Sequence, residues 1–119
     1  MKIKPTHRGL AYGDGHMQGD GEEGQVVRIV GNNLFAVNTD PAQPSFGILV
    51  KSAKAGQMPG IYCQGGTYET EVFEGTIAAG DALKVSAAGK LTNGVGASDE
   101  VIARAIAMEN GTLTFALLI

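Results

Sequence analysis

Glycine and other turn-forming residues interrupt this chain so often that no long helix fits between them. The 119 residues include 18 glycines, and from residue 25 onward short apolar runs alternate with clusters of Gly, Asn, Asp and Pro. Short apolar runs bounded by such clusters are typical of β-strands joined by tight turns. We therefore expect a mainly β protein: a small single-domain, glycine-rich β-sandwich or barrel of short antiparallel strands, with little or no helix.

Three segments of the body have the pattern of a β-hairpin, with apolar residues in alternation on both sides of a turn. The expected hairpins are residues 25–39 with a turn at Gly31–Asn33, residues 61–75 with a turn at Gly65–Gly66, and residues 82–92 with a turn at Ala88–Gly89. In the third hairpin we expect Leu83 and Val85 to point inward.

The last segment allows two interpretations. Ser98 could cap a helix that Asp99 and Glu100 begin. Alternatively, Asn110–Gly111 has the composition of a type I′ turn, which would join two antiparallel strands. In that hairpin the expected pairs are Glu109 with Thr112, Met108 with Leu113, Ile106 with Phe115, and Ile102 with Ile119. We favour the hairpin because the turn residues and the apolar pairs agree.

The first 24 residues differ from the body in composition. They are rich in glycine and poor in apolar side chains, so ordering them has a large entropic cost and little burial to offset it. Charge is divided along them, with Lys2, Lys4 and Arg8 in residues 1–12 and four acids in residues 13–24. We expect a flexible N-terminal arm over residues 1–24 and a β domain over residues 25–119.

The acidic part of this arm partly matches the sequence motifs of known binding loops, but it lacks the flanking elements or ligands that those motifs require. Gly19 to Gly24 matches G-x-G-x-x-G, but a strand-like segment follows it and its acids would repel a phosphate. Calcium would find oxygen ligands here, but His16 and Gln18 stand where an EF-hand requires Asp or Asn. His7 and His16 together lack a third ligand for a transition metal. We expect no metal site and no cofactor.

No group of residues has the spacing of a catalytic site. Both histidines lie in the arm, whereas Cys63 lies in an apolar strand and is expected to be a small buried hydrophobic residue. Glu69 and Glu71 alternate with apolar residues, as an exposed strand face does. Without an acid, a base and an electrophile in one place, we expect that the chain is not an enzyme.

Charge and hydropathy exclude further classes of partner. The net charge is −3 at pH 7, whereas a nucleic-acid-binding protein needs a basic stripe. The basic first residues are not followed by an apolar run, so we expect no secretory signal and no membrane span. A single cysteine requires no oxidising compartment. We expect a chain that is synthesised in the cytoplasm.

Four stretches of the body carry a family resemblance: GILVKSA at residues 47–53, YCQGGTYETEVF at 62–73, GDALKVSAAGKLT at 80–92 and ENGTLTFALLI at 109–119. In their order and in their small-residue turns they resemble the head decoration, or cement, proteins of tailed bacteriophages, including the lambda type. The resemblance covers residues 34–119.

The resemblance implies a structural virion protein that sits on the exterior of the capsid and stabilises the expanded shell. It implies the major capsid protein as partner, a homotrimer on the capsid, and synthesis in the cytoplasm of the host bacterium. By position, the arm would bind the shell through strand addition to a sheet edge of the capsid. The expected capsid-binding residues are Ile3, Lys4, Pro5, Arg8, Leu10, Tyr12 and Met17.

Deletion of residues 1–20 would then leave the domain folded and abolish shell binding. Two other functions fit the same composition. One is a phage tail or fibre-associated β module. The other is a small metal- or ligand-binding β barrel that uses Asp14, His16 and Asp20.

Overall fold

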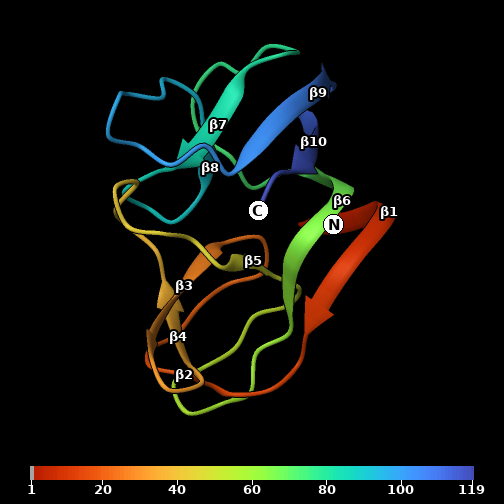
Figure 1. Cartoon of the computed structure of the whole chain (residues 1–119). Coiled ribbons are helices and arrows are strands. Elements are labelled where there is room, and N and C mark those ends of the chain that lie inside the picture. Colours follow the sequence, from red (N-terminus) through yellow and green to blue (C-terminus); the bar gives the residue numbers. More distant parts are fainter. Residues whose placement is uncertain (1) are drawn as a thin grey trace.

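The computed structural model describes residues 2–119, and within them it contains ten β-strands and no helix (Figure 1). The expected mainly β fold is thereby confirmed. Along the sheet the strand order is β2-β4-β3-β5-β6-β10-β9-β7-β8, and β1 pairs with β6 outside this path. The strands are β1 (Ile3–Tyr12), β2 (His16–Met17), β3 (Val26–Gly31), β4 (Leu34–Val37), β5 (Gly47–Leu49), β6 (Ile61–Thr70), β7 (Ala82–Val85), β8 (Leu91–Thr92), β9 (Ala103–Glu109) and β10 (Thr112–Leu117).

Strand β6 joins the two halves of the sheet. One of its sides pairs with β1 along the whole length, whereas the other side pairs with β5 at its start and with β10 at its end. Between these two partners the Gly65 N–H donates to the Ile119 carbonyl at 2.9 Å. In Figure 1 strands β2 to β5 lie to the left of β6 and toward the bottom of the view, and β7 to β10 lie toward the top.

The expected hairpin over residues 61–75 is wrong, because Gly65 and Gly66 lie inside the single strand β6. Their φ angles are 64° and 89°, a region that glycine enters at little cost. Here the two glycines bend the strand but do not reverse it, as glycines at bulges do. The buried Tyr68 donates its hydroxyl to the Gly65 carbonyl at 3.0 Å, and burial raises the pKa of this hydroxyl.

The other two predicted hairpins are present. Strands β3 and β4 pair antiparallel around Asn33, which has a φ of 55°. Strands β7 and β8 pair through Val85 and Leu91, and Leu83 and Val85 point inward as expected.

The last segment is a hairpin, as favoured, and not a helix. Asn110 and Gly111 both have positive φ, 52° and 76°, as a type I′ turn requires. The predicted pairs of Glu109 with Thr112 and of Met108 with Leu113 are observed.

Beyond these pairs the expected register is wrong. Phe115 pairs with Ala105 because Ile106 is an extra residue in a β-bulge. The bulge reverses the faces of β9, so Ala103 and Ala105 are buried and Ile106 is 50% exposed.

Two hydrophobic clusters share β3, β5 and β6, because consecutive residues of these strands, such as Ile61 and Tyr62, belong to different clusters. The larger one gathers side chains from every strand except β2 and β4 around Tyr68 and Phe115, whose rings stack with centroids 5.6 Å apart. The smaller one lies among the lower strands and includes Met17, Phe35 and Ile61. Because β6 contributes to both clusters, its position fixes the two halves against each other.

The expected division at residue 24 does not separate an arm from a domain. Residues 3–12 form β1 in the sheet, β2 pairs in parallel with β4, and Gly21 bridges Ala53. The sequence argument counted apolar side chains, whereas main-chain hydrogen bonds to a neighbouring strand need none. Residues 2–119 contain no helix long and apolar enough to cross a membrane.

Candidate functional site

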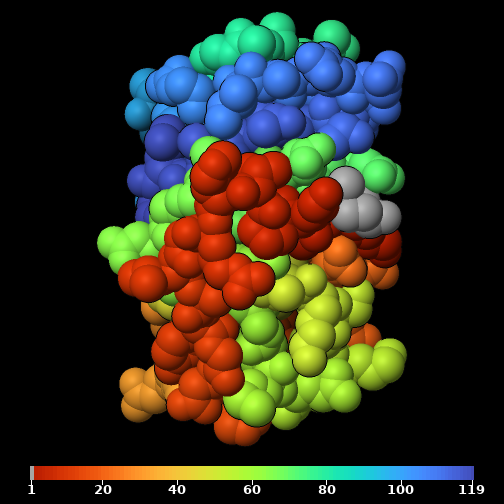
Figure 2. All heavy atoms as spheres, turned by 90° about the vertical axis from the view of Figure 1, so that its right-hand side faces the viewer, coloured from red at the N-terminus to blue at the C-terminus, as the bar shows by residue number. Residues whose placement is uncertain are grey.

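Strand β1 has an open outer edge. It pairs with β6 on one side only, and no strand within residues 2–119 pairs with its other side. The two terminal strands of the sheet, β2 and β8, have further backbone partners instead. Met17 of β2 exchanges hydrogen bonds with Gly56 and Gln57, and Leu91 of β8 accepts one from Glu74. Figure 2 shows β1 as the red surface on the face of the molecule that carries this edge.

Anchors at both ends and one in the middle hold β1 on the body. At its start the Glu23 carboxylate accepts from the Lys2 and Ile3 N–H groups at 3.3 and 3.1 Å. In the middle, the hydroxyls of Thr6 and Thr67 are hydrogen-bonded at 2.6 Å. The strand is therefore ordered before any partner arrives.

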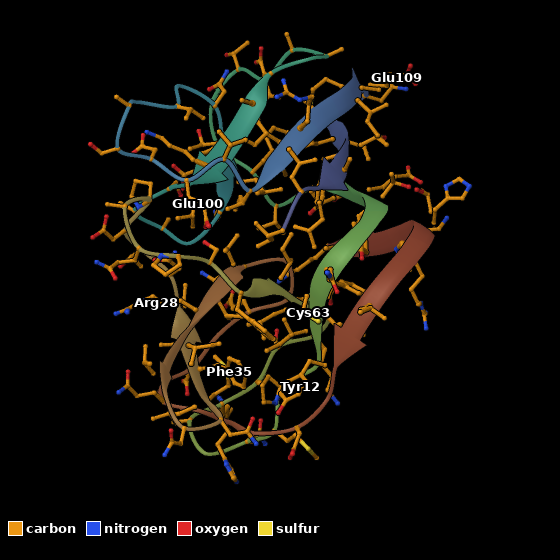
Figure 3. The ribbon with its side chains drawn as sticks, in the orientation of Figure 1. Tyr12, Arg28, Phe35, Cys63, Glu100 and Glu109 are labelled. Carbon is orange, nitrogen blue, oxygen red and sulfur yellow. The ribbon has the colours of Figure 1, made fainter. Side chains whose placement is uncertain are left out.

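The far end of β1 is held by aromatic packing. The Tyr12 ring centroid lies 5.8 Å from those of both Phe35 and Phe46, and its hydroxyl donates to Asn33 Oδ1 at 2.5 Å. Figure 3 shows Tyr12 and Phe35 together in the lower half of the molecule. This contact ties β1 to the β3–β4 hairpin.

The predicted capsid-binding residues divide into surface and core. Lys4, Arg8 and Leu10 are exposed on β1, and Pro5 and Tyr12 are half-buried. Ile3 and Met17 are 7% and 1% exposed, so these two belong to the hydrophobic clusters and are not available to a partner. Sequence reasoning did not include the exposed Thr6 and His7, which a strand assignment of residues 3–12 would have added.

The charged side chains of β1 are all basic. Residues 3–12 contain Lys4 and Arg8 and no acid, and the exposed Lys2 immediately precedes them. Within residues 2–119 the one ion pair joins Lys84 to Asp99 at 2.9 Å, so no carboxylate pairs with the β1 cations. Although the whole chain has a net charge of −3, the surface around β1 is therefore locally positive.

Three of the four acids of residues 13–24, Asp14, Asp20 and Glu23, serve as separate hydrogen-bond acceptors. The Asp14 carboxylate accepts from the Gly15 N–H and Asn33 Nδ2, and the Asp20 carboxylate accepts from the Ala55 N–H. No cluster of three or more His, Cys, Asp or Glu side chains suited to a metal occurs in the described part of the chain. Asp14, His16 and Asp20 are thus not gathered into one ligand set.

The remaining residues considered for chemistry are dispersed. Cys63 is half-buried against the smaller cluster and is a free thiol. Glu69 is half-buried and Glu71 is exposed, while both histidines lie exposed on β1 and β2. A cleft beside Asp20 and Glu22 also contains Lys54, so it presents both signs of charge.

Comparison with known proteins gives a likeness of fold. No family model matches the chain, and no curated protein matches it in sequence. Among solved structures, the chain is similar to the head fiber gp8.5 N base of bacteriophage phi29. The TM-score is 0.66 at 14% sequence identity, over 91% of this chain and 92% of the other. At this identity the shared property is the fold, which extends over nearly the whole length of both chains.

Proposed function

We propose that this chain is a structural protein of a bacteriophage virion, which binds the outer surface of the head and stabilises the expanded shell. One observation carries the proposal: nearly the whole chain has the fold of a protein described as the base of a phage head fiber. The resemblance of residues 34–119 to head decoration proteins, which rests on separate grounds, points to the same location. The role that we propose for this chain is binding and not catalysis.

The partner we propose is the major capsid protein, bound by a homotrimer of this chain. Three copies that bind together convert later contacts into intramolecular ones, so weak contacts sum to a stable attachment. A protein that binds the expanded shell and not its dissociated subunits stabilises the shell by mass action.

A second candidate is the base module of a fibre, which attaches an appendage to the head without reinforcing it. The description of the phi29 protein as a head fiber base favours this alternative. The two candidates differ in consequence, because only a decoration protein is required to raise the stability of the shell.

Cosedimentation tests the shared part of the proposal. The purified chain is mixed with expanded heads, with unexpanded heads and with tails of a candidate phage, and each pellet is assayed. We expect the chain in the pellet of expanded heads alone. Recovery with tails alone, or with none of the particles, would overturn the proposal.

A thermal assay separates the two candidates. Expanded heads are heated with and without saturating protein, and release of capsid subunits is followed by light scattering. A higher disassembly temperature indicates a decoration protein, whereas binding without such a rise indicates a fibre base. Light-scattering mass measurement of the free protein tests the trimer.

A further inference from the structure

We propose that the outer edge of β1 (residues 4–11) is a strand-addition site selective for an acidic, extended segment of the partner. This inference rests on the proposed function for the source of that segment. It specifies the chemistry of the segment, which the head-binding proposal leaves open.

The backbone of β1 provides the first part of the argument. A strand paired on one side only presents a row of free N–H and C=O groups on the other side, which template the pairing of a further strand. The Glu23 carboxylate covers the beginning of this edge, and the open part follows from Lys4 onward. Because Thr6 and Tyr12 already fix β1 to the body, a partner strand meets an ordered template and incurs less ordering cost.

The side chains of β1 provide the second part. Lys4 and Arg8 are exposed, and no carboxylate within residues 2–119 forms an ion pair with either of them. Leu10 is 61% exposed and offers an apolar contact beside the two cations. A segment that carries carboxylates and an apolar residue complements this edge, and a basic segment is repelled by it.

The same features argue against a second copy of β1 as the occupant. Two β1 edges would bring like charges of Lys4 and Arg8 together. Charged side chains on edge strands are one device by which such strands avoid pairing with each other. The occupant is therefore a different chain segment of opposite charge.

A peptide titration tests the inference without the virion. The probe is a ten-residue peptide in which glutamate and valine alternate, compared with peptides carrying glutamine or lysine in place of glutamate. Amide hydrogen exchange by NMR reports where the probe binds. We expect the glutamate peptide to slow exchange at β1 amides that are unprotected in the free protein, and we expect a weaker effect of the glutamine peptide and none of the lysine peptide.

Charge reversal provides the matched variants. Lys4→Glu combined with Arg8→Glu should weaken binding of the glutamate peptide about tenfold or more, since two surface charge contacts change sign. Lys51→Glu combined with Lys54→Glu, at exposed positions outside β1, makes the same change in net charge and should leave binding unaltered. Equal binding of all three peptides, or protection outside β1, would overturn the inference. The inference would also be overturned if the solution mass of the unaltered protein rose with protein concentration and the β1 double variant showed no such rise.

The head-binding assay separates this inference from the proposed function. If the chain cosediments with expanded heads and the β1 double variant does so equally well, the edge inference fails and the function stands. If the unaltered chain binds no head, the proposed function fails, and the peptide titration alone decides on the edge.

Discussion

Gly9 follows Arg8, the residue opposite Gly66 in the β1–β6 pair, and neither glycine has room for a side chain. A Cβ atom on Gly66 would lie 2.5 Å from the Gly9 nitrogen, and one on Gly9 would lie 2.1 Å from the Gln64 carbonyl oxygen. Real Cβ atoms do not approach backbone atoms so closely. The attachment of β1 to the body therefore depends on these two glycines.

Gly9→Ala should lower the free energy of unfolding by about 1–3 kcal/mol, because the backbone of β1 or β6 must shift to accept the methyl group. Gly13→Ala is the matched control, since a Cβ there meets nothing within 4 Å. Its effect should stay within about 0.5 kcal/mol. Urea denaturation measures both values, and equal stability of the two variants would contradict the close packing of β1.

Deletion of residues 2–12 should destabilise the whole protein, contrary to the sequence-based expectation that residues 1–20 are dispensable for folding. The deletion leaves one side of β6 unpaired and removes Tyr12 from Phe35 and Phe46. We expect a lower melting temperature and loss of dispersed NMR signals from residues of β6. A truncated chain as stable as the full one would show that β1 is an accessory strand. Binding assays should consequently use charge-reversed variants of the full chain.

Ile102 and Ile106 should respond differently to truncation because Ile102, just before β9, is buried and Ile106, at the bulge in β9, is exposed. Ile102 is 1% exposed, so Ile102→Ala should cost about 2–5 kcal/mol of stability. Ile106 is 50% exposed, and Ile106→Ala should cost about 1 kcal/mol or less. Chemical denaturation of the two variants compares them directly. Similar large losses would indicate the unbulged register, in which both isoleucines point inward.

Asp99 should contribute to stability in a pH-dependent way. The hydrogen bond from Lys84, followed by that from the Gly96 N–H, lowers the pKa of the Asp99 carboxyl below its ordinary value of 3.8. A carboxyl whose pKa is lower in the folded state stabilises the protein above the unfolded pKa, and this contribution is lost as pH falls through the folded pKa.

Asp99→Asn should therefore lower the melting temperature at pH 7 and reduce its decline below pH 4, relative to the unaltered chain. Glu109→Gln provides the control, at an exposed position on β9. Melting curves between pH 2 and pH 7 measure the difference. This range extends from about two pH units below the ordinary Asp pKa to about three units above it. Parallel curves for Asp99→Asn and the unaltered chain would show that this carboxyl has the same pKa folded and unfolded.

Local chemistry made parts of this fold predictable. Asn110–Gly111 allows positive φ at two successive residues, and the alternation of Leu83 and Val85 assigns one face of a strand to the core. Both signals lie within a few residues of sequence, so they identified hairpins and inward faces correctly. The charge and position of the N-terminal segment, and not these hairpin signals, placed Lys4, Arg8 and Leu10 in the segment that forms the candidate surface.

Pairing between distant segments was decided by the tertiary structure. Gly65–Gly66 reads as a turn in sequence, yet the structure uses it as a bend in β6, because β1 and β10 supply hydrogen-bond partners that continue the strand. The bulge at Ile106 likewise depends on which alanines fit beneath Phe115 and Leu117. The sequence by itself determined where the chain can turn and which residues alternate. Only the tertiary structure decided that residues 3–12 are a sheet strand with a basic open edge, because backbone hydrogen bonds between strands are made by every residue type and leave no pattern in the sequence.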